Sequence, residues 1–217
     1  ISMSFNMFIT GRRAAQVAYF VLLVILIFQI FKFEKIKAFF MSLCLVPVIF
    51  LSAYQLSPIF NERVDAAIIN YSKFSPDIEI SRSSSIGYRM TFQLNSLEII
   101  KKHPFIGVGT GDFPQEYKKV NMVNSPSIAN TTNPHNMYIL ITVQSGLLGL
   151  ISFLSIFYFQ FKTAFRSTNI LVRNVGFALP MMFLVIMFSD SYLLGHYTTL
   201  IYIFFSSFLC RDFESSS

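Results

Sequence analysis

The chain has 217 residues, of which 53% are hydrophobic and only 13% are charged, with a mean hydropathy of +0.56. A soluble domain carries about 25% charged residues, so this composition excludes an ordinary soluble protein and indicates a polytopic membrane protein. The formal net charge of +6 does not indicate a nucleic-acid partner. The long polar segment 56–136 is nearly neutral, with eight Lys/Arg against seven Asp/Glu, and no basic stripe remains once the basic connections between apolar segments are set aside. Neither cysteine has the spacing to histidine that a metal site would need.

Hydropathy predicts five transmembrane helices, and therefore an all-α fold. The predicted spans are residues 14–33, 38–55, 137–161, 175–194 and 198–210. The first is about as long as the 20 residues that a helix needs to cross the hydrocarbon core, and Pro47 in the second is a tolerated kink. Residues 1–9 resemble the end of an earlier span. Because the chain begins at Ile1 without a signal-peptide pattern, we expect further N-terminal transmembrane helices in a longer protein.

Positive charge predicts the orientation of these spans. Basic residues occupy the connections after the first, third and fifth spans: Lys32, Lys35, Lys37, Lys162, Arg166, Arg173 and Arg211. Such connections are cytoplasmic, so the long segment before the third span lies outside the cytoplasm. The predicted organisation is transmembrane helices in 1–55, a mostly helical extracytoplasmic loop in 56–136, three transmembrane helices in 137–210 and a cytoplasmic tail in 211–217.

Two arginines break this charge pattern. Arg12 and Arg13 precede the first span at its outer end, where positive charge in a short connection is disfavoured. Their side chains either extend to lipid phosphates or form an anion site, because guanidinium groups are the preferred bidentate partners of phosphate. The second interpretation requires other cations at the same place.

The predicted loop contains such a cation on an amphipathic helix. Residues 81–102 indicate a lead-in followed by a helix with an apolar face, which Pro104 ends. Arg89 lies in the first turns of this helix. It is either a solvated surface charge or a phosphate contact.

Three glycines follow the predicted helix at Gly107, Gly109 and Gly111. They lack both the full spacing of a dinucleotide-binding loop and the Lys-Ser/Thr ending of a P-loop. We interpret them as a tight turn that brings the backbone close to another element.

A histidine lies where the loop re-enters the membrane. His135 follows a proline and precedes an aromatic run. Because histidine exchanges protons near neutral pH, His135 is a candidate general base, with a capping or interfacial role as the alternative. His103 and His196 are less well placed for chemistry. Asp190 lies near the outer end of the fourth span, where a carboxylate indicates either a functional site or a hydrogen bond between helices.

The order of these residues resembles the O-antigen ligase and O-antigen polymerase superfamily. The resemblance rests on Thr10-Gly11-Arg12-Arg13, Arg89, the segment from His103 to Phe113, His135-Asn136-Met137-Tyr138 and Gly146-Leu147-Leu148-Gly149-Leu150. It covers about residues 10–160. The chain departs from the family pattern at Phe92, often Trp, and at Gln144, often Glu, which leaves ligase and polymerase open. Arg13 matches the first arginine of the family better than Arg12 does.

The resemblance implies glycan transfer at the periplasmic face of the bacterial inner membrane. The donor would be an undecaprenyl diphosphate-linked glycan, and the acceptor a hydroxyl of the lipid A core or of a second lipid-linked glycan. The implied diphosphate-binding residues are Arg13, Arg89 and Arg12, and the implied catalytic residues are His135 and Arg89. The diphosphate bond of the donor supplies the energy, so we expect neither a nucleotide nor a metal nor any other cofactor.

Two other classes of function remain open from the sequence. A transporter or flippase for the same lipid-linked glycan would also need outward-facing arginines, although it would be expected to place polar residues deep within several spans. A non-catalytic subunit of a polysaccharide assembly complex would need neither His135 nor both arginines. The nearly uniform apolar character of the spans favours chemistry at the membrane surface.

Overall fold

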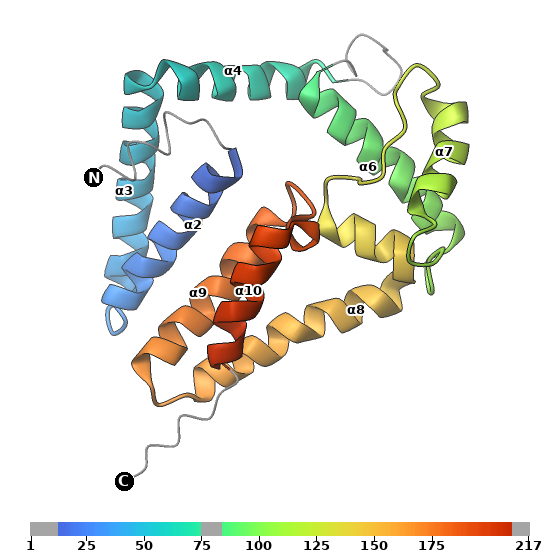
Figure 1. Cartoon of the computed structure of the whole chain (residues 1–217). Helices are drawn as coiled ribbons and strands as arrows, with labels where there is room; N and C mark the ends of the chain where they lie inside the picture. Colours follow the sequence, from blue (N-terminus) through green and yellow to red (C-terminus); the bar gives the residue numbers. More distant parts are fainter. Residues whose placement is uncertain (1–12, 75–83, 210–217) are drawn as a thin grey trace. The chain divides into compact units, whose positions relative to one another are not determined.

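The computed structural model describes residues 13–74 and 84–209, and every regular element in these ranges is a helix (Figure 1). The prediction of an all-α fold is therefore confirmed for the described part of the chain. The chain divides into two compact units, residues 1–73 and 74–217. Because their boundary falls inside the predicted loop 56–136, that loop contributes to both units.

Two of the described helices are long and apolar enough to cross a membrane. They are α3 (Lys35–Leu56) and α8 (Met137–Arg166), identified by length and composition alone. The other three predicted spans overlap the shorter helices α2 (Arg13–Ile30), α9 (Ile170–Ile186) and α10 (His196–Leu209). The number of spans therefore stays a prediction.

The first unit consists of α2, α3 and α4 (Pro58–Ser72), packed in chain order. Helix α3 continues through Pro47. Ser57 then caps α4, because its side chain accepts a hydrogen bond from the Phe60 amide at 3.3 Å. The Tyr54 hydroxyl donates to Asp65 Oδ1 at 2.7 Å, which ties the last turns of α3 to α4.

The second unit begins with two helices of the predicted loop, α6 (Ser85–Lys102) and α7 (Phe113–Asn124). The predicted helix before Pro104 is confirmed as α6. It begins where the Ser84 side chain accepts a hydrogen bond from the Gly87 amide at 2.9 Å.

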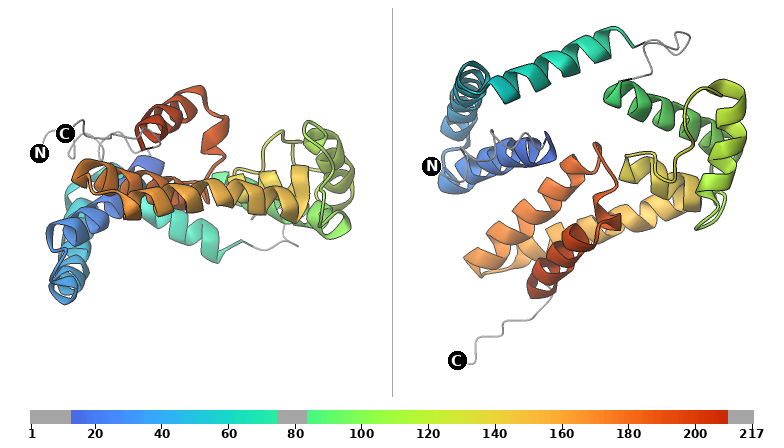
Figure 2. Two further views of the ribbon diagram at one scale, coloured as in Figure 1. Left: turned by 90° about the horizontal axis from the view of Figure 1, so that it is seen from below. Right: turned by 45° about the horizontal axis from the view of Figure 1, so that its top comes forward.

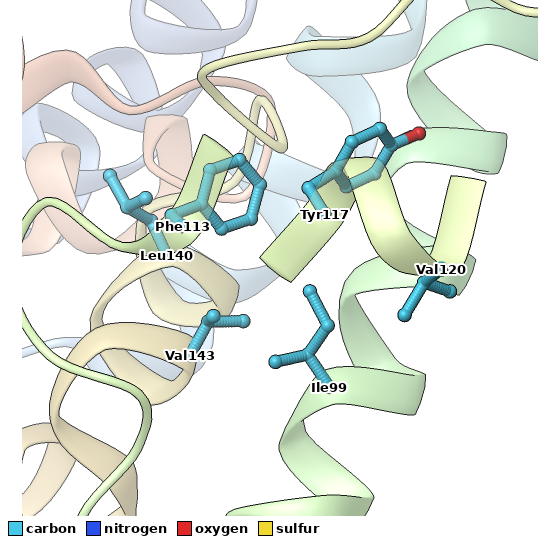
Figure 3. Close-up of a cluster of buried hydrophobic side chains, with 6 residues drawn as sticks. All are labelled: Ile99, Phe113, Tyr117, Val120, Leu140 and Val143. Atoms are coloured by element: carbon cyan, nitrogen blue, oxygen red, sulfur yellow. The ribbon is translucent and has the colours of Figure 1, made fainter. Parts of the chain in front are cut away.

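Helices α6 and α7 pack on the first part of α8 through a small apolar core. Its members are Ile99, Phe113, Tyr117, Val120, Leu140 and Val143, all buried, which Figure 3 shows in close-up. Beside this core, Asn95 Nδ2 lies 3.2 Å from each of Tyr117 Oη, Asn121 Oδ1 and Ser125 Oγ. Burial raises the pKa of the Tyr117 phenol above its usual 10.0, although the hydrogen bond with Asn95 lowers it in part. The loop helices are therefore joined to α8 as one packed body.

The rest of the second unit is a hairpin of α8 and α9, with α10 packed across it. Helix α9 packs along α8, and α10 lies over one face of this pair, as both views show (Figures 1 and 2). A buried polar group joins α8 to α10: Gln160 Nε2 donates to Ser206 Oγ at 2.8 Å, and the Tyr202 hydroxyl donates to Gln160 Oε1 at 2.7 Å. Hydrogen bonds of this kind join helices within membranes.

The structure corrects the end of the fourth predicted span. Hydropathy extends this span over residues 175–194, but α9 ends at Ile186 and is followed by a turn and the short 3-10 helix η1 (Tyr192–Leu194). The reason is tertiary: the Met187 carbonyl accepts a hydrogen bond from the Met137 amide at 3.0 Å. The average hydropathy of a sequence window contains no information about such a hydrogen bond.

Helix α8 is broken at Gly146, whose backbone has φ 66° and ψ −166°. The break leaves backbone groups of the two half-helices without their usual partners. The segment after α6 satisfies four of them. Amides of Val108 and Gly109 donate to the carbonyls of Val143 and Gln144 at 2.8 and 2.9 Å, and amides of Leu147 and Leu148 donate to those of Pro104 and Phe105 at 2.8 and 3.3 Å.

Two glycines permit this close contact between backbones. Gly107 has φ 70°, and a Cβ on it would clash with the backbone of Gln144, while a Cβ on Gly146 would clash with the backbone of Phe105. The glycine segment is therefore a tight turn against another element, as the sequence predicted. Its hydrogen bonds satisfy the backbone groups at the break in α8. Beyond this break the second half of α8 runs in a new direction (Figure 1).

Replacing Gly146 with alanine is expected to destabilise the second unit by more than about 1 kcal/mol. The new Cβ would meet both an unfavourable positive φ and the backbone of Phe105. Gly111→Ala is the matched control, because Gly111 has φ 101° but no atom within 4 Å of its Cβ position. Thermal unfolding of the purified protein in detergent measures the effect, and equal midpoints for the two variants would contradict the role of the contact.

Candidate functional site

Three separate segments of the second unit bring polar side chains together at one end of α8. Arg89 comes from the first turns of α6, His135 from the residues that precede α8, and Asp190 from the turn after α9. We call these three residues the charged cluster. They lie far apart in sequence, and only the packing of the three helices makes them neighbours.

Asp190 connects the other two members of the cluster. His135 Nδ1 lies 3.0 Å from Asp190 Oδ1, and Arg89 Nη2 lies 3.6 Å from Asp190 Oδ2. The Ser191 amide also donates to Asp190 Oδ1 at 2.8 Å. Arg89 Nη1 donates to the Ser189 carbonyl at 3.1 Å. The carboxylate is thus contacted from three sides, and it positions both the imidazole of His135 and the guanidinium of Arg89.

His135 has a strained backbone. Its φ is 54°, in the left-handed region, which costs on the order of 1 kcal/mol for a residue with a side chain. The conformation is held because the His135 amide donates to Asn133 Oδ1 at 2.9 Å and Gln93 Nε2 donates to the His135 carbonyl at 3.5 Å. Strain of this kind concentrates at functional sites, which marks His135 independently of any resemblance.

The imidazole of His135 is fixed between two groups. Its ring stacks on that of Phe92, with centroids 6.1 Å apart and planes 23° apart, and its Nδ1 faces Asp190. The side chains of His135 and Asp190 are 31% and 28% exposed, so the pair is open to a substrate on one side. Phe92 therefore helps to orient the ring.

The turn that carries Asp190 is joined to the start of α8. Asn136 caps α8 by accepting hydrogen bonds from the amides of Tyr138 and Ile139, at 3.0 and 3.2 Å. Asn136 Nδ2 also donates to the Phe188 carbonyl at 3.3 Å. Since the same short segment contains His135, these bonds fix the separation between His135 and Asp190.

This arrangement can move a proton. When Nδ1 of His135 carries the proton, it donates to Asp190 and leaves Nε2 as a base, and the carboxylate then stabilises the imidazolium that forms. Within the charged cluster the charge of Arg89 is offset by that of Asp190. A dianionic ligand would therefore need further cations in addition to Arg89.

The structure brings together Arg89 and His135, two of the predicted site residues, and adds Asp190. Arg12 and the side chain of Arg13 lie outside the described residues. His103 is exposed at the end of α6, and His196 is exposed at the start of α10. In the described part of the chain, no three His, Cys, Asp or Glu side chains gather as they would around a metal ion.

The partnership of Asp190 with His135 was not predicted. A carboxylate between two serines in an apolar stretch was a signal for function, but it does not name a partner 55 positions away. The contact of Phe92 with His135 was not predicted either, and it gives Phe92 a role in orienting the imidazole ring.

Comparison with known proteins identifies one family model that matches the chain. It is described as O-antigen ligase, and it covers residues 1–154. This range includes Arg89, His135 and the glycine segment, whereas Asp190 lies beyond it. A search of curated proteins found no match.

Proposed function

Because the chain belongs to the O-antigen ligase family, we propose that it is a membrane enzyme that transfers a glycan from an undecaprenyl diphosphate carrier to a hydroxyl acceptor. Family membership supports a role of the ligase or polymerase type in surface polysaccharide assembly. The observation that carries the enzymatic proposal is the pairing of His135 with Asp190 beside Arg89.

In the proposed reaction His135 acts as the general base. The acceptor oxygen forms a bond to C1 of the donor sugar while the bond from C1 to the phosphate oxygen breaks. The electron pair of that bond leaves with the diphosphate, and the acceptor proton passes to Nε2 of His135. Asp190 positions the imidazole through Nδ1, which lies 3.0 Å from its carboxylate, and stabilises its charge.

Cations bind the leaving diphosphate in this scheme. Arg89 is assigned to the diphosphate, since guanidinium groups form bidentate hydrogen bonds with phosphate oxygens. Because Asp190 offsets the charge of Arg89, the diphosphate of the donor needs further cations. These are Arg13, the first residue of α2, and Arg12, which comes directly before it in the sequence.

The proposed location is the bacterial inner membrane, with the loop 56–136 on the periplasmic side and the tail 211–217 in the cytoplasm. The family and the apolar helices support a membrane protein. The basic connections support the orientation. Membrane lipids are the proposed partners of the five predicted spans.

Purified protein in proteoliposomes tests the function. The donor is a lipid-linked glycan, supplied either with a lipid A core acceptor or alone. A product on the lipid A core identifies a ligase, and extension of the lipid-linked glycan identifies a polymerase. If neither product forms with the full-length protein, the enzymatic proposal is wrong, and a transporter or a non-catalytic subunit takes its place.

Replacing Asp190 with asparagine is expected to lower the transfer rate by about ten- to a hundredfold, less than loss of the base itself. The amide keeps the shape of the side chain but no longer stabilises a charged imidazole. A transfer rate that stays unchanged in the Asp190→Asn protein would contradict the role of Asp190.

A further inference from the structure

The turn Pro104–Ile106, which is hydrogen-bonded to α8 at its break, exposes two large apolar side chains. Phe105 is 67% exposed and Ile106 is 76% exposed. Their backbone is nevertheless fixed, because the amides of Leu147 and Leu148 donate to the carbonyls of Pro104 and Phe105. Apolar side chains held outward by a fixed backbone indicate an interaction surface when they continue into a larger patch.

Such a patch continues along α8. Directly after the break, Leu147, Leu148 and Ile151 are also exposed, and the first two are the residues to which the turn is hydrogen-bonded. We call Phe105, Ile106, Leu147, Leu148 and Ile151 the tip patch. Its α8 members belong to a candidate membrane span, so the turn extends the apolar surface of that span.

The length of the second half of α8 places the tip patch at a definite depth. From Leu147 to Arg166 the helix has about 20 residues and a length of about 30 Å, which equals the thickness of the hydrocarbon core. With Arg166 at the opposite interface, the break at Gly146 lies at the outer edge of the core. The tip patch lies at that same edge.

The charges beside the tip patch match this depth. Lys101 and Lys102 lie in the last turn of α6, just before Pro104, and both are exposed. Lys101 pairs with Glu98 at 2.6 Å. This order of side chains fits the membrane interface. The lysine charges would lie among the lipid phosphates, and the apolar side chains of the tip patch would enter the acyl region.

We propose that the turn Pro104–Ile106 inserts into the outer leaflet as an interfacial anchor and that its partner is the lipid acyl chains. This inference rests on the proposed membrane insertion of α8. The anchor holds the end of α6 at the bilayer surface. Since α6 also carries Arg89, the anchor keeps the charged cluster at the height where the diphosphate of a lipid-linked donor lies.

Tryptophan fluorescence tests the anchor directly, because the chain contains no tryptophan. The variant Phe105→Trp is reconstituted in phosphatidylethanolamine and phosphatidylglycerol vesicles that contain lipids brominated on their acyl chains. The expected result is loss of emission in brominated lipid, emission at shorter wavelength than in water, and little quenching by aqueous acrylamide.

Two further variants make the result interpretable. Tyr158→Trp, exposed in the middle of the second half of α8, should be quenched by brominated lipid, and Met122→Trp, exposed near the far end of α7, should be quenched by acrylamide. Failure of lipid quenching at Tyr158→Trp would overturn the proposed span and hence the proposed function. Lipid quenching at Tyr158→Trp without quenching at Phe105→Trp would overturn the anchor alone. Quenching of Phe105→Trp by neither agent would mean that protein covers the turn. Equal lipid quenching at Met122→Trp would mean that the lipid quenching at Phe105→Trp is not specific to the turn. Both results contradict the anchor.

Discussion

Replacing His135 with asparagine is expected to lower the rate of glycan transfer by about 10²- to 10⁴-fold, the usual contribution of a general base. Asparagine is the sharpest replacement because it tolerates positive φ well, and the backbone of His135 has φ 54°. Its amide can also retain a hydrogen bond with Asp190, but it cannot accept the acceptor proton. The assay is the transfer of glycan from a lipid-linked donor in proteoliposomes.

His103→Asn is the matched control for this experiment. His103 is exposed at the end of α6, so its replacement should leave the rate unchanged. His135→Ala serves as a second variant, compared in cells by membrane insertion and by the amount of surface polysaccharide. If His135→Asn and His135→Ala both insert normally and support full polysaccharide synthesis, His135 is not the base.

Replacing Arg89 with lysine is expected to lower the transfer rate by about 10²-fold or more, the loss typical of removing one group that stabilises transition-state charge. Lysine keeps the positive charge but lacks the planar fork that binds two phosphate oxygens. It also cannot donate to the Ser189 carbonyl and reach Asp190 with two separate nitrogens, as Arg89 does. Single-turnover rates at saturating donor measure this effect.

A structural role for Arg89 would give a different result. If Arg89 only joined α6 to the turn after α9, Arg89→Lys would lower the thermal unfolding midpoint while the rate per folded molecule stayed the same. Arg63→Lys, on the exposed face of α4, is the control, with no expected change in either quantity. An Arg89→Ala protein that inserts and transfers glycan at the normal rate would remove Arg89 from the site.

Local sequence predicted the elements near the site well. The helix that carries Arg89 follows from its apolar pattern and from Pro104, and it is found as α6. The glycine segment was predicted as a turn against another element, and the hydrogen bonds to α8 confirm this. These features depend on neighbours in the chain, which propensity and backbone sterics describe.

Hydropathy was less successful at the helix ends. The fourth predicted span extended to residue 194, whereas α9 ends at Ile186. Similarly, one continuous span was predicted after His135, whereas α8 is broken at Gly146. In both places the backbone leaves the helix because a distant segment supplies the hydrogen bonds, and the average hydropathy of a window does not contain that information.

The sequence by itself therefore determined the all-α fold and the family of the protein. It also identified Arg89 and His135, two of the side chains on which the proposed chemistry depends. Only the tertiary structure decided that Asp190 joins them, because a hydrogen bond across 55 positions depends on how α8 and α9 pack. It likewise decided where α8 breaks. The physical reason is the same in both cases: a polar group in an apolar setting takes its partner from whichever segment packing brings within about 3 Å, and chain order does not specify that segment.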